Sequence, residues 1–108
     1  MNKKNKIILK EISNKLRNQL KGEIQDIVLF GSRSNTTADD ASDFDVLIIL
    51  KKQYNWKKKR IIRDYCYEIG LKYDIIIDSK IISTYELNKT PKGAHPLYKD
   101  AIDKGIHA

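Results

Sequence analysis

Residues 24–50 of the 108-residue chain read IQDIVLFGSRSNTTADDASDFDVLIIL. Two apolar runs, 24–30 and 43–50, flank a segment rich in Ser, Thr, Asn, Asp and Gly, a composition that is typical of a loop or a short helical turn. The second run is almost wholly apolar after Asp45, which favours a strand in the middle of a sheet with both faces covered. We therefore expect two strands joined through a polar corner that starts at Gly31.

Helical patterns lie on either side of these strands. Between residues 3 and 21 apolar residues recur at helical spacing, and Gly22 then provides a C-terminal stop. The apolar residues of this first helix are Leu9, Ile12, Leu16 and Leu20. Residues 54–70 predict a second amphipathic helix, capped by Gly70. Its inward residues are expected to be Trp56, Ile61 or Ile62, Tyr65 and Ile69.

The remainder of the chain predicts one more strand and two more helices. Residues 73–78 (YDIIID) have the apolar character of a third strand. Residues 83–86 (STYE) form a capping-box pattern that starts a short helix, and a last helix runs from Pro96 to Gly105. The sequence thus predicts an α/β (α+β) fold, a small mixed sheet of about three strands flanked by helices. We interpret residues 1–108 as a single domain, because a chain of this length builds one core.

The composition argues against several classes of protein. No stretch approaches the roughly 20 apolar residues of a membrane span, and the longest apolar run near the N-terminus is Ile7–Leu9. We therefore expect a soluble, cytoplasmic protein without membrane contacts. The sequence has one cysteine, Cys66, which excludes a disulfide framework and a cysteine-based metal cluster. His95 and His107 are interpreted as surface residues rather than as ligands.

The formal net charge is +7, and the excess is concentrated in two blocks. One block is residues 57–60 (KKKR) with Arg63, and the other is Lys3, Lys4, Lys6 and Lys10. One interpretation is that both blocks are solvated helix faces. The other is that they form a surface for an acidic partner, either a protein or RNA.

Asp43 and Asp45 are the first candidates for chemistry. They are two residues apart on a predicted strand, so both side chains leave the same face. Two adjacent carboxylates repel each other unless a cation lies between them, and their oxygens suit Mg²⁺. The corner at Gly31 and Ser32 offers backbone N–H groups and a hydroxyl to phosphates bound by the same ion. This stretch therefore predicts a metal–nucleotide site.

Asp74 is the third candidate, because it lies at the start of the predicted third strand. If that strand neighbours the second, its carboxylate meets those of Asp43 and Asp45 at one edge of the sheet. Three carboxylates suit a two-metal site for phosphoryl transfer, in which the protein mainly positions groups and neutralises charge.

The combined pattern resembles the minimal nucleotidyltransferase family of the DNA polymerase β-like superfamily. The matching features are Gly31-Ser32, Asp43-Phe44-Asp45 ten residues later, Asp74, and the closing segment HPLYKDAIDKGIHA at residues 95–108. The resemblance covers nearly the whole chain. It implies a polymerase β-like nucleotidyltransferase core and an enzyme that transfers NMP, expected to be AMP from ATP, to an acceptor hydroxyl.

The resemblance also implies a nucleotide-binding role for each residue of the corner. Gly31 lets the chain turn and the phosphates approach, Ser32 bonds the β- or γ-phosphate, and Arg33 steadies the triphosphate. The corner departs from the family pattern, because Arg33-Ser34-Asn35-Thr36 stands where the family commonly has Arg-Ala-Arg-Gly. The loss of the second cation is expected to weaken phosphate binding.

For the three carboxylates the resemblance implies metal binding and catalysis. Asp43 and Asp45 hold two Mg²⁺ ions, while Asp74 binds the catalytic metal and helps to accept the proton of the attacking hydroxyl. The attack occurs at the α-phosphate and releases pyrophosphate.

The compact chain is similar to small antitoxins of two-gene modules whose partner is a HEPN-type toxin. That similarity implies transfer of AMP to a tyrosine of the toxin and a hetero-oligomer of the two proteins. One alternative is a non-catalytic module that neutralises a partner by masking it. A less favoured alternative is a nucleotidyltransferase acting on RNA or on a small molecule, which rests on the positive charge.

Overall fold

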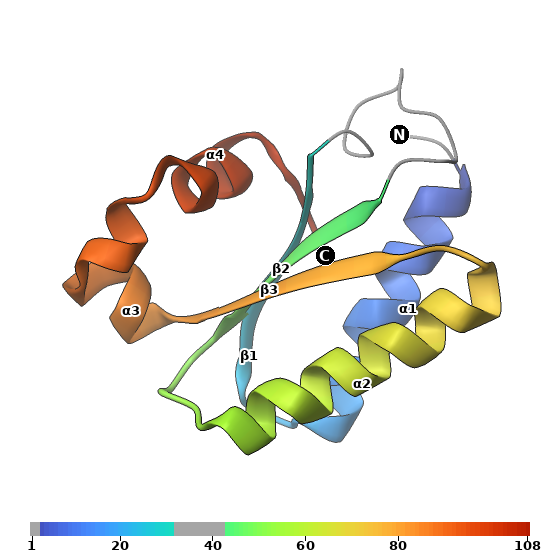
Figure 1. The fold of residues 1–108 in the computed structure, drawn as a ribbon, viewed down its shortest axis with the longest axis horizontal. Coiled ribbons are helices and arrows are strands. Elements are labelled where there is room, and N and C mark those ends of the chain that lie inside the picture. Colours follow the sequence, from blue (N-terminus) through green and yellow to red (C-terminus); the bar gives the residue numbers. More distant parts are fainter. Residues whose placement is uncertain (1–2, 32–42) are drawn as a thin grey trace.

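The computed structural model describes residues 3–31 and 43–108, which form a four-stranded mixed sheet with helices on both faces (Figure 1). Ser32 and Arg33 lie outside the described residues. In chain order the elements are α1 (Lys3–Gln19), β1 (Ile24–Phe30), β2 (Phe44–Leu50), α2 (Trp56–Tyr73), β3 (Ile77–Ser83), α3 (Thr84–Lys89), the 3₁₀ helix η2 (Pro91–Ala94), α4 (Pro96–Lys104) and β4 (Ile106–His107).

The sheet has the strand order β3-β2-β1-β4. β1 is antiparallel to both β2 and β4, whereas β2 and β3 are parallel. A parallel pair needs a crossover connection, and α2 provides it. Every residue of β2 except Asp45 is buried, which confirms that this apolar run forms a central strand.

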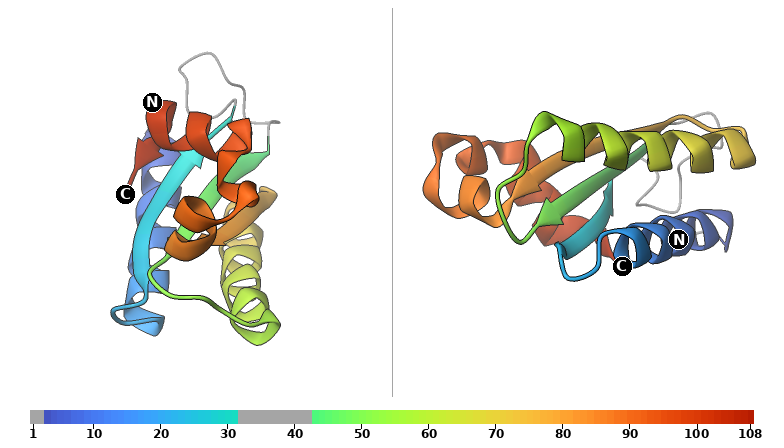
Figure 2. Two further views of the ribbon diagram at one scale, coloured as in Figure 1. Left: turned by 90° about the vertical axis from the view of Figure 1, so that its left-hand side faces the viewer. Right: turned by 90° about the horizontal axis from the view of Figure 1, so that it is seen from below.

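Alternating residues of the strands build a core on each face of the sheet. Ile27, Val46 and Ile48 belong to the larger core, which also contains the buried residues of α1 and α2. Val28 and Leu47 belong to a smaller core that includes residues of α3 and α4. Figure 2 shows the sheet between these two groups of helices. Asp45 alternates with Val46, so its side chain lies on the α4 face.

The expected third strand at residues 73–78 is wrong in its position. α2 continues to Tyr73, and Asp74 then caps it in the left-handed conformation at φ 55°, with its N–H directed to the carbonyls of Gly70 and Leu71. The strand begins only at Ile77. The composition of residues 73–78 (YDIIID) is compatible with a strand throughout, but Tyr73 and Asp74 form the C-terminal end and the cap of α2. Gly70 is therefore a buried residue inside α2, not its cap.

The remaining expectations are confirmed in part. α1 buries its expected apolar stripe, Ser83 and Glu86 form the capping box of α3, and α4 starts at Pro96 and is capped by Gly105. Trp56 was expected to point inward, but it begins α2 and is largely exposed. The fourth strand, β4, was not expected, because two residues carry no detectable strand pattern. In the part of the chain that the structure describes, no helix has the length and apolar character to cross a membrane.

A pH-dependent contact joins β4 to β1. Nδ1 of His107 lies 2.6 Å from Oδ2 of Asp26, and Nε2 lies 2.9 Å from the carbonyl oxygen of Ile102. Both partners accept hydrogen bonds, so the doubly protonated ring satisfies both. The bond to Asp26, followed by the bond to Ile102, raises the pKa of His107 above its usual value. The contact therefore favours the protonated imidazolium.

We predict that this contact stabilises the fold more at low pH than at high pH. A raised folded-state pKa means that the stabilisation is complete below the unfolded value of about 6.5 and is lost as the pH rises through the folded value. His107→Gln should lower the free energy of unfolding by about 0.5 kcal/mol at pH 5.5, the usual size for a partly exposed pair, and by less at pH 9. Urea unfolding followed by circular dichroism at both pH values measures this, and an equal loss at both would contradict the prediction.

Candidate active site

The parallel register of β2 and β3 places two carboxylates side by side. The backbone N–H of Phe44 donates to the carbonyl of Ile76 at 2.9 Å, and this alignment pairs Asp45 with Asp78. Asp43 immediately precedes β2 and is exposed. The three aspartates come from the starts of two neighbouring strands, so their charges gather at one end of the sheet.

The electrostatics of Asp45 reflect this gathering. Burial is the largest effect that raises the pKa of Asp45, and the neighbouring charges of Asp78 and then Asp43 raise it further. The ammonium of Lys80 acts in the opposite direction. A half-buried carboxylate that faces two others is an environment that a bound cation would stabilise.

Asp45 also packs against the corner at the end of β1. Gly31 has φ 75°, in the region that favours glycine, and Oδ2 of Asp45 occupies the space that a Cβ on this residue would need. Two features therefore require glycine at position 31: the positive φ of the backbone and the close approach of the Asp45 carboxylate.

Lys80 is a site residue that the sequence did not single out. Its Nζ lies 3.5 Å from Oδ2 of Asp78, and both side chains are nearly half exposed. A cavity of about 520 Å³ begins at Lys80 and is lined also by Pro91, Lys92, His95, Leu97 and Tyr98. The cavity is therefore linked to the carboxylates through Lys80, and its lining includes two lysines and a histidine. The signal for Lys80 was its position two residues after Asp78, which is informative only once the strand is placed.

The structure brings together Asp43 and Asp45, but it places Asp74 differently from the expectation. Asp74 is the exposed C-cap of α2, three residues before β3, and the residue in register with Asp45 is Asp78. Both aspartates lie in YDIIID, and the sequence alone offered no means to choose between them. Of the corner residues expected to bind nucleotide, Gly31 is described, whereas Ser32 and Arg33 lie outside the described residues.

The chemistry of the donor set fits a hard divalent cation. Carboxylate oxygens are the ligands that Mg²⁺ prefers, and the mutual repulsion at Asp45 is what such an ion would relieve. Within residues 3–31 and 43–108, no three His, Cys, Asp or Glu side chains are gathered closely enough to hold a metal ion. The oxygens of Asp78 are instead directed to Lys80.

Comparison with known proteins identifies the family. Residues 10–100 match the family model described as polymerase beta, nucleotidyltransferase. This chain belongs to that nucleotidyltransferase family. It is accordingly a nucleotidyltransferase, an enzyme class that in general uses a nucleoside triphosphate and a divalent metal ion.

Two relatives from Methanocaldococcus jannaschii are each named "Putative protein adenylyltransferase". One, MJ0141, is 37% identical over 70 residues, which cover 65% of this chain and 71% of the relative. The other, MJ0604, is 32% identical over 81 residues, which cover 75% of this chain and 76% of the relative.

Among solved structures, two variants of the MntA-HpeT toxin-antitoxin have a similar fold. One matches with a TM-score of 0.57 and 15% identity over 90% of this chain and 69% of the solved chain. The other matches with a TM-score of 0.58 and 20% identity over 100% of this chain and 72% of the solved chain. At these identities the likeness is one of fold.

We predict that the two glycines with positive φ differ in their tolerance of a side chain. Gly22 has φ 76° and open space where a Cβ would lie, whereas a Cβ on Gly31 would meet Asp45. Gly22→Ala should cost about 1 kcal/mol of unfolding free energy for the left-handed backbone alone. Gly31→Ala should cost at least about 1 kcal/mol more, because the carboxylate must also move.

Urea unfolding of the two variants measures the difference. The double variant Gly31→Ala with Asp45→Ala should recover part of the excess loss, since it removes the clashing oxygen. Equal losses for the two glycines would contradict the close approach of Asp45 to the corner.

Proposed function

We propose that this nucleotidyltransferase transfers AMP from ATP to a tyrosine hydroxyl of a protein partner, a HEPN-type toxin, and thereby acts as its antitoxin. The observation that carries the proposal is the pairing of Asp45 with Asp78, next to Asp43, on parallel strands. In the reaction the hydroxyl oxygen bonds to the α-phosphorus, the bond from that phosphorus to the bridging oxygen breaks, and pyrophosphate leaves.

Asp43, Asp45 and Asp78 are the proposed metal-binding residues. Asp78 takes the role that the sequence pattern assigned to Asp74, because its strand position faces Asp45. Bound Mg²⁺ would supply positive charge to the phosphates and lower the pKa of the attacking hydroxyl. Asp78 is the proposed acceptor of the hydroxyl proton, since it lies on an edge strand of the described sheet, where an acceptor can approach it.

The triphosphate is proposed to lie between the corner and Lys80. Gly31, Ser32 and Arg33 are the proposed phosphate contacts on the corner side. On the other side, Lys80 supplies a flexible point charge at the mouth of the adjoining cavity. Movement of this ammonium from Asp78 to a phosphate would free the carboxylate for the metal ion.

Two findings support a protein as the acceptor. The relatives from M. jannaschii are named as protein adenylyltransferases, and the solved structures of similar fold belong to a toxin-antitoxin pair. We propose that the antitoxin and its toxin form a hetero-oligomer in the cytoplasm. RNA is a less favoured partner for the reaction.

One observation favours a second candidate function, in which the chain neutralises its partner by masking alone. Among the described residues no three His, Cys, Asp or Glu side chains are close enough to hold a metal ion, and Lys80 is engaged with Asp78. A protein that binds without catalysis would keep this arrangement.

We predict that substitution of Asp78 abolishes the transfer of AMP to the toxin, whereas substitution of Asp74 does not. Labelled ATP, Mg²⁺ and the toxin are incubated with Asp45→Asn, Asp78→Asn or the matched control Asp74→Asn, and label on the toxin is measured. The first two variants should lose at least about 100-fold in rate, the usual scale for loss of charge stabilisation at a reacting group. Asp74→Asn should stay within about twofold of the wild type, because Asp74 is exposed at the end of α2 and is not the residue paired with Asp45.

The reverse result, loss in Asp74→Asn alone, would restore the assignment drawn from the sequence. The masking function replaces the catalytic one if two results occur together. The double variant Asp45→Asn with Asp78→Asn neutralises the toxin fully, and neither the wild type nor any variant transfers label.

A further inference from the structure

α2 carries an exposed row of residues that the proposed reaction does not use. The row, here called the α2 stripe, consists of Trp56, Arg60, Arg63, Tyr67 and Leu71. Their spacing of three or four residues places them along one side of the helix. The side chains buried against the sheet, such as Ile62, Cys66 and Ile69, lie on the other side.

The stripe is unusually apolar for a surface. Trp56 is 68% exposed, Tyr67 66% and Leu71 64%. Large exposed apolar side chains gathered along one side of a helix are a feature of interaction sites on soluble proteins. Trp, Tyr and Arg are also the residue types that dominate binding energy at protein interfaces, and four of the five stripe residues are of these types.

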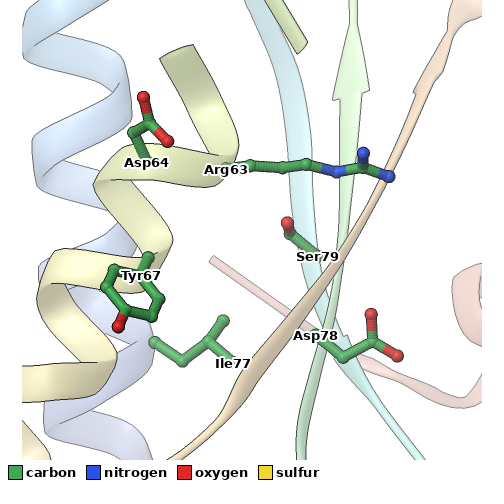
Figure 3. A pocket seen from close by; sticks show the side chains of 6 residues that line it. All are labelled: Arg63, Asp64, Tyr67, Ile77, Asp78 and Ser79. Atoms are coloured by element: carbon green, nitrogen blue, oxygen red, sulfur yellow. The ribbon is translucent and has the colours of Figure 1, made fainter. Parts of the chain in front are cut away.

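The stripe borders a pocket that leads to the candidate active site. The pocket has a volume of about 330 Å³ and is lined by Arg63, Asp64, Tyr67, Ile77, Asp78 and Ser79. Figure 3 shows Arg63 extended from α2 toward β3, with Ile77 pointing back toward Tyr67 and Asp78 pointing away from the helix. The pocket therefore extends from the stripe to β3 at Asp78, whose carboxylate points away from α2 on the far side of the strand.

β3 leaves room for such a molecule to pass. Within the described sheet β3 is an edge strand with β2 as its hydrogen-bonded neighbour on one side. The pocket lies where α2 faces this edge, near the start of β3. An occupant can thus continue around the edge toward the carboxylates of Asp78 and Asp45 without displacing a neighbouring strand.

The positively charged residues of the α2 stripe favour an acidic partner. Arg60 and Arg63 are exposed within it, and Lys57 adds a further cation, with its Nζ 5.9 Å from the centre of the Trp56 ring. An acidic partner complements these groups. RNA fits less well, because the exposed aliphatic side chain of Leu71 suits apolar side chains of a protein, whereas bases stack on aromatic rings.

We propose that the α2 stripe is the docking surface for the acceptor protein, which contributes an acidic segment that also carries apolar side chains. The segment lies along α2 from Trp56 to Leu71, fills the pocket at Tyr67 and brings the acceptor to the β3 edge beside Asp78. The identity of the occupant as the acceptor rests on the proposed function, whereas the surface itself is defined by the exposed residues.

The test measures binding of the full chain to the protein encoded beside it, the toxin of the proposed pair. The variants are Tyr67→Ala and Arg60→Glu with Arg63→Glu, and the matched control is Lys99→Glu with Lys104→Glu, the same charge change at exposed positions of α4. Biolayer interferometry gives Kd for the partner, and calorimetry with ATP and Mg²⁺ gives Kd for the nucleotide. Circular dichroism establishes that each variant is folded.

Both stripe variants should raise Kd for the partner at least about tenfold, as expected for residues at the centre of an interface. Their Kd for ATP should stay within about twofold of the wild type, and the α4 control should change neither constant. This result would support docking even if no AMP were transferred, in which case the proposed reaction alone would fail.

Three results would overturn the proposal. One is a stripe variant that binds the partner as tightly as the wild type, or a wild type that does not bind it. Transfer of AMP in the labelled-ATP assay would then leave the proposed function intact. Another is loss of binding to an RNA of about 20 nucleotides with protein binding unchanged, which would make the stripe a nucleic-acid surface. The third is a wild-type dimer that Tyr67→Ala converts to a monomer in sedimentation, which would make it a self-association surface.

Discussion

The parallel pairing of β2 with β3 is the constraint on which the candidate site depends. Parallel strands cannot be joined by a tight turn, so the chain must return to the start of β2 before β3 begins. α2 has 18 residues and a length of about 27 Å, enough to run back past a seven-residue strand of about 23 Å. The left-handed cap at Asp74 then ends the helix and turns the chain, and the bond between Phe44 and Ile76 sets the register.

That register decides which chemistry the sheet can present. A shift by one residue would place Ile77 or Ser79 beside Asp45 and would turn the side chain of Asp78 to the α2 face. The observed pairing instead sets two carboxylates side by side on the α4 face. The burial of Asp45 and then its repulsion by Asp78 raise its pKa and oppose folding, and the close approach of Asp45 to Gly31 restricts its ability to move away. The surrounding core of buried Ile, Leu and Val offsets this repulsion, an arrangement common at functional sites.

The parts of this fold that were predictable from sequence are those with a long or chemically distinctive pattern. The helix at the N-terminus, the central strand after Asp45 and the capping box at Ser83 each carry such a signal. The boundary within YDIIID carries none, because isoleucines are acceptable both at a helix end and in a strand. The choice between Asp74 and Asp78 therefore needed the pairing of distant strands. Trp56 was misplaced for a related reason, since its spacing fits the helix period but it lies at the helix N-terminus, where the sheet does not cover it.

The role of α2 in setting the register also links the exposed surface to the site. Ile62 and Ile69 anchor the helix against the sheet, while Tyr67 and Arg63 on its outer side border the pocket that ends at Asp78. Because the helix and β3 are consecutive, a displacement of α2 along its axis would be transmitted through the short turn at Asp74 to the start of β3, where Asp78 lies. A partner bound to the outer side of α2 would therefore contact the helix that leads directly into the strand carrying Asp78. In this fold the exposed side of α2 and the strand that presents Asp78 are joined by three residues, so a change in the position of one constrains the other.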